Sequence, residues 1–234
     1  MKTIGLIGGM SWESTIPYYR IINEEVRKRL GGLHSAKIIL HSVEFDEIEQ
    51  CQSNGDWDKS AQILGKAAQG VEAAGVDFIL ICTNTMHKVQ PVISQMIHIP
   101  IIHIADTTAY ELEKYNIRKV GLLGTKYTMK QEFYKQRLYN HGIEVLIPEE
   151  PDIDFINEVI FHELCIGKIE NKSQQHFEKI IENLRTKGAE GVILGCTEIG
   201  MLIKQENSVL PVFDTTEIHA KCAVELALEM HAYK

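Results

Sequence analysis

The sequence lacks long apolar runs and clusters of positive charge. Its longest apolar runs, such as residues 78–82, fall far short of the roughly 18 residues that cross a membrane, so we expect no membrane partner. The 24 Lys and Arg residues are outnumbered by 32 Asp and Glu residues, which gives a formal net charge of −8. Because nucleic acids and anionic surfaces are bound through clustered basic residues, we expect no nucleic-acid partner and favour a small molecule.

A signal peptide and the common metal and nucleotide motifs are also missing. The N-terminal apolar segment is interrupted by glycines and an acid, so we predict a cytoplasmic protein. The five cysteines form no Cys-x-x-Cys pair and the ten histidines form no His-Glu-x-x-His motif, so we expect neither a disulfide framework nor a metal site. The segment at residues 5–9 departs from the dinucleotide fingerprint, because Ile7 and Met10 occupy the second and third glycine positions.

Short apolar runs are present, and they alternate with longer amphipathic segments. This alternation is typical of βαβ units, so we predict the α/β class with parallel sheets flanked by helices. The predicted strands are residues 3–7, 36–43, 76–81, 119–123, 144–147 and 191–194, and the predicted helices are residues 15–30, 56–74, 128–140, 153–165 and 173–187. A chain of 234 residues can form two domains without a disulfide or a structural metal.

Several segments occur twice in the same order, which indicates an internal duplication. Residues 5–8 (GLIG) recur as 121–124 (GLLG), residues 74–80 recur as 187–193, and a proline followed by Asp-Thr-Thr at 100–108 recurs at 211–216. We predict two pseudo-symmetric lobes, with residues 1–108 and a returning C-terminal helix at 216–234 in the first and residues 109–215 in the second. Open parallel sheets bind ligands at the carboxyl ends of their strands, so we expect the active site in the cleft between the lobes.

Each repeat carries a reactive side chain directly after a buried strand. Residues 82–87 (CTNTMH) follow one predicted strand, and residues 196–198 (CTE) follow its repeat. A lone cysteine is most often a small buried apolar residue, but a strand end that leads into a helix can hold a carboxylate and lower the pKa of a thiol. Two such groups across one cleft could remove a proton from one face of a carbon and return it to the other, which is racemisation or epimerisation.

The same residues resemble a known family. Residues 8–15 (GGMSWEST), 82–87 (CTNTMH), 104–106 (IAD), 123–125 (LGT) and 195–198 (GCTE) are similar to segments of the aspartate/glutamate racemases, and most like the L-aspartate/glutamate-specific, broad-specificity branch. The resemblance spans nearly the whole chain. It implies two α/β lobes, an amino-acid substrate, two-base catalysis without a cofactor, and a homodimer.

The resemblance implies Cys196 as one catalytic residue and leaves two candidates for the other. Many relatives read Cys-Asn-Thr at the first site, which puts Thr83 at the catalytic position and Cys82 on the last strand residue. Because side chains alternate at a strand end, both cannot face the substrate, so we assign Thr83 and keep Cys82 as the alternative.

The remaining candidates surround these two positions. We expect side-chain and backbone donors to hold the α-carboxylate and three further residues to contact the substrate. Glu198 is also a candidate for substrate binding, and it either orients Cys196 or begins a helix. The predicted carboxylate donors are Asn84, Thr85 and Thr197, and the further contacts are Met10, Gln52 and Thr125.

Specificity and reaction type stay open. Gln52 and Cys165 stand near segments where strict aspartate racemases hold the distal carboxylate with positive charge, so strict selection of acidic substrates is not implied. A related racemase, an isomerase or a decarboxylase-like reaction on the same scaffold remains an alternative, as does a non-catalytic amino-acid-binding protein.

Overall fold

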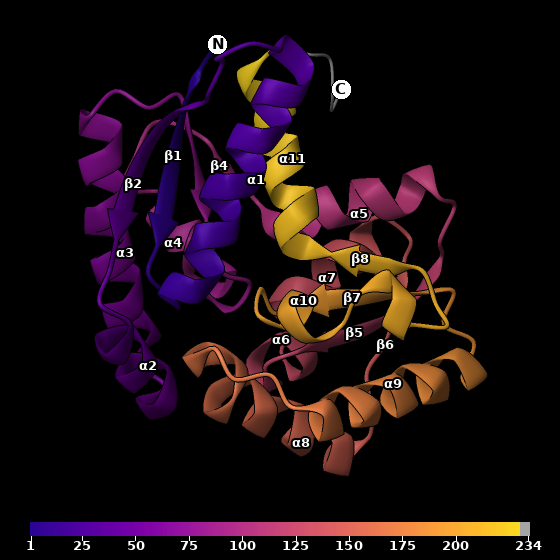
Figure 1. Cartoon of the computed structure of the whole chain (residues 1–234). Coiled ribbons are helices and arrows are strands. Elements are labelled where there is room, and N and C mark those ends of the chain that lie inside the picture. The colour runs from indigo at the N-terminus through magenta and orange to yellow at the C-terminus, as the bar shows by residue number, and fades with distance from the viewer. Residues whose placement is uncertain (230–234) are drawn as a thin grey trace. The chain divides into compact units, whose positions relative to one another are not determined.

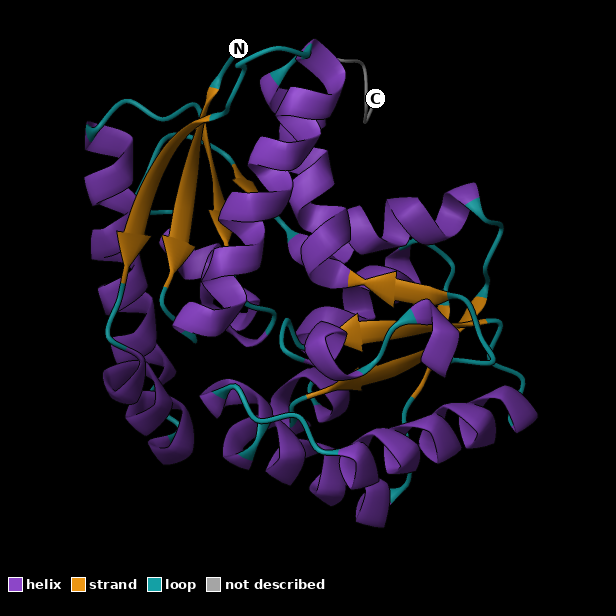
Figure 2. Cartoon of the chain, viewed as in Figure 1, coloured by secondary structure: helices purple, strands orange, loops and turns teal. Residues whose placement is uncertain are grey.

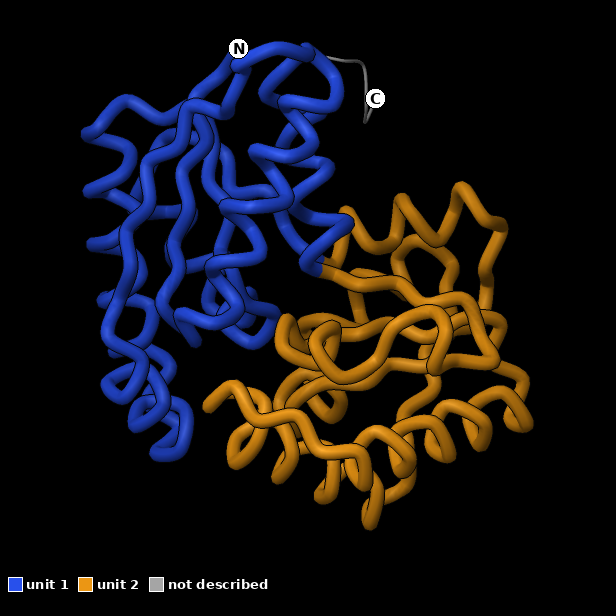
Figure 3. The backbone as a smooth tube through the Cα atoms, viewed as in Figure 1, with its two compact units in different colours: residues 1–104, 216–234 blue, residues 105–215 orange. Residues whose placement is uncertain are grey.

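The computed structural model describes residues 1–229, and the chain divides into two compact units (Figures 1 and 3). Unit 1 contains Met1–Ile104 and the returning C-terminal segment from Thr216, and unit 2 contains Ala105–Thr215. Residues 230–234, the end of the helix predicted at 216–234, lie outside the described residues. Within residues 1–229, no helix is long and apolar enough to cross a membrane.

Unit 1 is built on a four-stranded parallel sheet in the order β2-β1-β3-β4. Its strands are β1 (Thr3–Gly8), β2 (Lys37–Ser42), β3 (Phe78–Ile81) and β4 (Ile101–Ile102). Its helices are α1 (Trp12–Leu30), α2 (Phe45–Asn54), α3 (Trp57–Ala73), α4 (Gln90–Ile93), α11 (Thr215–Ala227) and the 3-10 helix η1 (Thr85–Val89). Helices lie on both faces of this sheet (Figure 2).

The two faces of this sheet carry separate apolar clusters, and alternation along each strand assigns residues to them. In β3, Phe78 and Leu80 pack with α1 and α11, whereas Ile79 and Ile81 pack with α3 and α4. Strands that are covered on both faces are apolar throughout, which is why residues 78–81 form a continuous apolar run. The next residue, Cys82, continues the alternation into the cluster of α1 and α11.

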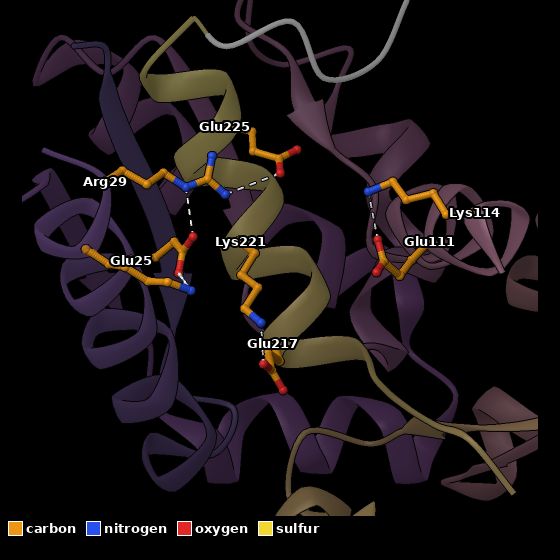
Figure 4. A network of polar contacts seen from close by, with 8 residues as sticks. Glu25, Arg29, Glu111, Lys114, Glu217, Lys221 and Glu225 are labelled. Carbon is orange, nitrogen blue, oxygen red and sulfur yellow. Dashed lines mark hydrogen bonds and ion pairs between the residues drawn. The ribbon is translucent and has the colours of Figure 1, made fainter.

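Helices α1 and α11 are also joined by a polar network on their outer side (Figure 4). Arg29 donates to Glu25 within α1 at 2.8 Å and to Glu225 of α11 at 3.3 Å. The C-terminal helix is therefore part of unit 1, attached by apolar packing and by the ion pair between Arg29 and Glu225, and together with α1 it covers one face of the sheet.

Unit 2 repeats the architecture of unit 1. Its parallel sheet has the order β6-β5-β7-β8. When the strands of each unit are numbered along the sequence, both sheets have the spatial order 2-1-3-4. Its strands are β5 (Lys119–Gly124), β6 (Glu144–Leu146), β7 (Gly191–Gly195) and β8 (Val212–Asp214). Its helices are α5 (Ile104–Lys114), α6 (Lys126–Lys130), α7 (Glu132–Asn140), α8 (Glu150–His162), α9 (Asn171–Thr186), α10 (Ile199–Leu202) and the 3-10 helices η2 (Leu164–Ile166) and η3 (Gln205–Asn207).

The predicted α/β class, with two parallel sheets flanked by helices, is confirmed. One predicted helix is wrong in detail, because residues 128–140 are covered by two helices. Gln131 adopts an extended conformation with φ −85° and ψ 152°, and this ends α6 before α7 begins at Glu132. The short edge strands β4 and β8 and the helix α2 were not predicted.

Candidate active site

In unit 2, the neighbouring strands β5 and β7 end at residues that pair with each other. Gly124, the last residue of the GLLG segment, pairs with Gly195. Cys196 is therefore the first residue beyond this pair, and Thr125 is the first residue beyond β5. Both residues follow the carboxyl ends of neighbouring strands, and both are buried.

The same register in unit 1 identifies the position equivalent to this cysteine. The pairing of β1 with β3 reaches Ile7 and Ile81, so Cys82 stands opposite Gly8, the last residue of the GLIG segment. Cys82 therefore corresponds to the glycine that ends β7, and Thr83 corresponds to the cysteine that follows it.

Cys82 and Thr83 have different surroundings. Cys82 has no exposed surface and lies in the apolar cluster with Leu6, Tyr18 and Leu80. Burial raises the pKa of its thiol. Thr83 is half-buried. Of these two residues, only Thr83 has surface that a ligand could reach.

The segment after Thr83 is held by hydrogen bonds inside unit 1. Asn84 and Thr85 are buried, and Thr85 begins η1. The ring of His87 has Nδ1 2.8 Å from the carbonyl oxygen of Thr83 and Nε2 3.2 Å from the backbone nitrogen of Ile104. A carbonyl oxygen can only accept and a backbone N–H can only donate, so His87 is a neutral imidazole with its proton on Nδ1.

Two other predicted contacts also lie in unit 1. Met10 follows β1 and packs in the apolar cluster against α3. Gln52 lies on α2 and is buried. The backbone N–H of Gly9, which has a φ of 90°, donates to Oγ1 of Thr15 at 2.8 Å, so the glycine turn before Met10 is fixed to the first turns of α1.

The cysteine of unit 2 shares a carboxylate with two other donors. Cys196 Sγ lies 3.0 Å from Oε2 of Glu198, and Thr197 Oγ1 donates to the same oxygen at 2.7 Å. Cys165, on η2, has its Sγ 3.7 Å from the other carboxylate oxygen. The Glu198 side chain is buried, so these three donors replace the water that a carboxylate would otherwise bind.

This arrangement raises the pKa of the Cys196 thiol. Burial is the largest cause, followed by the negative charge of Glu198 and then by Cys165. The expectation that a helix start lowers this pKa is wrong, because α10 has only four residues, Ile199–Leu202, and a carboxylate faces the sulfur. In the free protein Cys196 is therefore a thiol hydrogen-bonded to a base.

Thr125 has a structural role as well as a position near this site. Its hydroxyl caps α6 by accepting from the backbone N–H of Thr128 at 3.3 Å. No group of three or more histidine, cysteine or acidic side chains able to hold a metal ion is found among residues 1–229.

A family model described as Asp/Glu/Hydantoin racemase matches residues 7–223. The chain belongs to the Asp/Glu/hydantoin racemase family. The predicted family resemblance is thereby confirmed. In sequence, the chain is similar to the broad specificity amino-acid racemase RacX of Bacillus subtilis (strain 168), with 25% identity over 96% of this chain and 98% of that one.

Solved structures extend the likeness to the whole fold of this racemase-family chain. An Asp/Glu racemase-like protein from Yersinia pestis is 52% identical, with a TM-score of 0.91 over 97% of this chain and 100% of that one. An aspartate racemase homologue from Pyrococcus horikoshii OT3 is 38% identical, with a TM-score of 0.85 over 97% and 100%.

Sequence reasoning missed two features of this racemase-family site. It did not place Cys165 on the Glu198 carboxylate, because a contact between residues 33 apart leaves no mark on local sequence. It also missed His219, which lies near His87, with 5.8 Å between the ring centroids. The sequence signal for His219 is a histidine on an otherwise apolar face of α11. This signal can be recognised only once the packing of that helix against the sheet is known.

Proposed function

We propose that the protein is a cofactor-independent amino-acid racemase. It interconverts the L and D isomers of aspartate, glutamate or related polar amino acids by two-base proton transfer at the α-carbon. The observation that carries this proposal is the register equivalence of Thr83 and Cys196 at the strand ends of two duplicated sheets. Membership of the racemase family and the likeness to the broad specificity amino-acid racemase RacX support it.

The proposed first step uses Cys196 and Glu198 together. Glu198 takes the thiol proton across the 3.0 Å contact, which leaves a thiolate to remove the α-proton of the L isomer. The charge that develops on the α-carbon spreads into the α-carboxylate, which we assign to donors at Asn84, Thr85 and Thr197. In the free protein the Thr197 hydroxyl is bound to Glu198, so we assign its contribution to the backbone.

The proposed second step uses Thr83. Its hydroxyl donates its proton to the opposite face of the α-carbon and takes one back from solvent water, which gives the D isomer. Cys196 keeps the α-proton as a thiol, and Glu198 releases to solvent the proton that it took from the thiol. A threonine hydroxyl has too high a pKa to act as a resting base without help, whereas a thiol starts near ~8.5. The two half-reactions are therefore chemically unequal, and the thiol serves the L isomer.

The proposed substrate range is broad among polar amino acids. Gln52 is neutral and buried, and Cys165 is bound to Glu198. Neither residue supplies the fixed positive charge that strict recognition of a distal carboxylate needs. Met10 and Thr125, which follow β1 and β5, are proposed as further substrate contacts.

We also propose a cytoplasmic homodimer. A reducing compartment suits a mechanism that needs a free thiol.

The support for a second copy as partner lies in unit 1, where Trp12, Ile16 and Tyr19 form an exposed apolar stripe along α1. Strand β2 is an edge strand that pairs with β1 alone among the described strands, and its Leu40 is exposed. Open edges and apolar stripes of this kind are covered in stable assemblies.

One observation favours a second candidate function, a protein that binds amino acids without converting them. The raised pKa of Cys196 and the hydroxyl at Thr83 leave neither of these two side chains deprotonated in the free protein. Such a protein would keep the carboxylate donors and the fold while the α-proton stays in place.

Solvent deuterium exchange separates these functions. The protein, free of pyridoxal phosphate, is incubated in D2O with L-aspartate, L-glutamate or homoserine, and the α-proton signal is followed by NMR. A racemase exchanges this proton and forms the D isomer. A binding protein leaves the α-proton and the L isomer unchanged. A decarboxylase or another isomerase changes the signals of the carbon skeleton. Cys196→Ala is expected to abolish exchange, while the matched Cys82→Ala variant keeps it. Absence of exchange with every amino acid tested would refute the racemase.

A further inference from the structure

Three buried histidines lie together in unit 1, next to the segment that carries Thr83. His87, His103 and His219 are at most 5% exposed. The ring centroids of His87 and His103 are 4.5 Å apart, and those of His87 and His219 are 5.8 Å apart. Burial disfavours the charged form of each ring, and each buried ring nitrogen needs a hydrogen-bond partner.

The ring of His219 has such partners. Its Nε2 donates to the carbonyl oxygen of Ile102 at 2.9 Å, and its Nδ1 accepts from the hydroxyl of Tyr18 at 2.9 Å. Burial, followed by the neighbouring His87, lowers its pKa. His219 is thus a neutral ring of fixed tautomer, and it packs against one side of His87.

The ring of His87 joins two backbone segments that are not neighbours in sequence. Its Nδ1–H donates to the carbonyl oxygen of Thr83, and its Nε2 accepts from the N–H of Ile104. Ile104 is the last residue of unit 1 before the chain enters unit 2. His87 therefore ties the strand-end loop to the backbone that follows β4 in the same unit.

We propose that His87 is a positioning residue for Thr83. By holding the peptide carbonyl of Thr83, it fixes the orientation of the residue whose hydroxyl delivers the proton. This proposal rests on the proposed racemase function and adds a residue that touches neither the substrate nor the reacting atoms.

The comparison with unit 2 explains why unit 1 needs such a residue. The sulfur of Cys196 is held directly, by the Glu198 carboxylate at 3.0 Å, and its backbone carbonyl accepts from Ile199 at 3.1 Å. Thr83 is half-buried, and its backbone carbonyl accepts from the ring of His87 at 2.8 Å. A displacement of about 1 Å at a reacting group can cost roughly a hundredfold in rate, so a backbone clamp has a measurable effect.

Two conservative variants separate the two hydrogen bonds of the ring. In His87→Asn, the amide nitrogen lies near the place of Nδ1 and can still donate to Thr83. In His87→Gln, the amide reaches the place of Nε2 and can accept from Ile104 while the bond to Thr83 is lost. His87→Phe removes both bonds and keeps a ring in the cluster.

The proposal predicts a division among these variants. His87→Asn keeps kcat within a few-fold of the parent, whereas His87→Gln and His87→Phe lose roughly tenfold or more in kcat with little change in KM. Thermal melting of all three is measured in parallel, because a purely structural role would rank activity by melting temperature. Equal kcat for the Asn and Gln variants, or a higher kcat for Gln, would overturn the proposal.

A measurement that needs no catalytic turnover tests the hydrogen bond from His87 to Thr83 independently of the proposed racemase activity. The NMR shift of the Thr83 carbonyl carbon reports the hydrogen bond from His87. It is expected to move in His87→Gln and to stay near the parent value in His87→Asn. An unchanged shift in His87→Gln overturns the clamp whatever the activity. A third outcome is a parent protein that shows the hydrogen bond from His87 to Thr83 and yet exchanges no α-proton. That result refutes the racemase function, and with it the role of His87 in positioning a catalytic residue.

Discussion

At the scale of single residues, the chemistry of the site depends on how a carboxylate and a thiol share a proton. Glu198 accepts from Cys196 and Thr197 through one oxygen and from Cys165 through the other. Its negative charge disfavours a thiolate in the free protein, yet in the proposed mechanism the same carboxylate accepts the proton of the thiol. Substrate binding brings an ammonium group, and a positive charge near a buried thiolate stabilises it.

Glu198→Gln is expected to separate these two effects. Removing the negative charge lowers the pKa of the Cys196 thiol, so its alkylation rate should reach half its maximum at a lower pH than in the parent. Racemase turnover should nevertheless fall, because the amide cannot take the thiol proton. Alkylation at Cys196 is followed by mass spectrometry between pH 6 and 10, with Glu158→Gln on the exposed face of α8 as the control. An alkylation midpoint that does not move, or moves to higher pH, contradicts the role of the carboxylate.

Thr83→Cys is expected to remove the chemical asymmetry of the two strand ends. A thiol at this position can act as the base for the D isomer, which a hydroxyl cannot do at neutral pH. We expect kcat for the D isomer to rise by roughly tenfold or more, and kcat for the L isomer to change less. Thr83→Ser, which keeps a hydroxyl, is the matched control. Unchanged D-isomer turnover in Thr83→Cys would argue against Thr83 as a catalytic residue.

At the scale of elements, hydrogen bonds of His219 join α11 to β4 and α1 in unit 1, and the ring of His87 on η1 packs beside it. The folded pKa of His219 is lowered, whereas an unfolded chain has a histidine pKa near ~6.5. Above that pH neither state binds the proton, and below it the unfolded state binds more. The stability that His219 contributes is therefore present above about pH 6.5 and is lost as the pH falls.

Acid is thus expected to destabilise unit 1 in a way that His219 controls. One proton bound only by the unfolded state costs up to about 1.4 kcal/mol per pH unit. Urea unfolding at pH 7.5 and 5.5 should show a smaller loss of stability in His219→Gln, whose amide can still donate to Ile102. His98→Gln, which removes an exposed histidine, should keep the loss seen in the parent. Equal losses in the two variants would mean that another group controls the acid response.

Elements also determine how far the fold could be predicted. The central strands β1, β3, β5 and β7 are buried on both faces, and their continuous apolar runs made them recognisable. The edge strand β4 has two residues, too few for any periodic pattern. The break at Gln131 depends on its backbone conformation, and the amphipathic pattern continues across it. Local sequence patterns therefore identified the central strands, whereas the edge strand and the helix ends depend on tertiary structure.

The candidate site was predicted to the same extent and for a similar reason. Alternation at the strand end separated Cys82 from Thr83, because burial on a strand follows a period of two. The partners of Glu198 and the ring of His219 come from segments distant in sequence. The duplication located both strand ends, and the sequence offered Glu198 as one candidate for orienting Cys196. It could not predict that Cys165 shares this carboxylate or that His87 binds the backbone carbonyl of Thr83.

At the scale of the whole molecule, the proposed assembly depends on one face of unit 1. Asn23 of α1 lies midway between two exposed apolar residues, Ile16 seven residues before it and Leu30 seven residues after it. A two-fold axis near Asn23 would place Ile16 of one copy against Leu30 of the other, and Tyr19 against Arg27. A self-complementary surface of this kind suits a symmetric dimer, since the same patch serves both copies.

This arrangement predicts that a charge in the stripe separates the copies. Ile16→Glu is expected to convert a species of twice the chain mass into a single chain in light scattering after size exclusion, because a buried unpaired carboxylate is costly at an interface. Val209→Glu introduces the same charge at an exposed apolar residue of unit 2 and should leave the mass unchanged. Leu40→Glu tests the contribution of the β2 edge in the same way. A parent protein that is monomeric at micromolar concentration, or an Ile16→Glu variant that keeps the dimer mass, would show that the second copy does not cover this face.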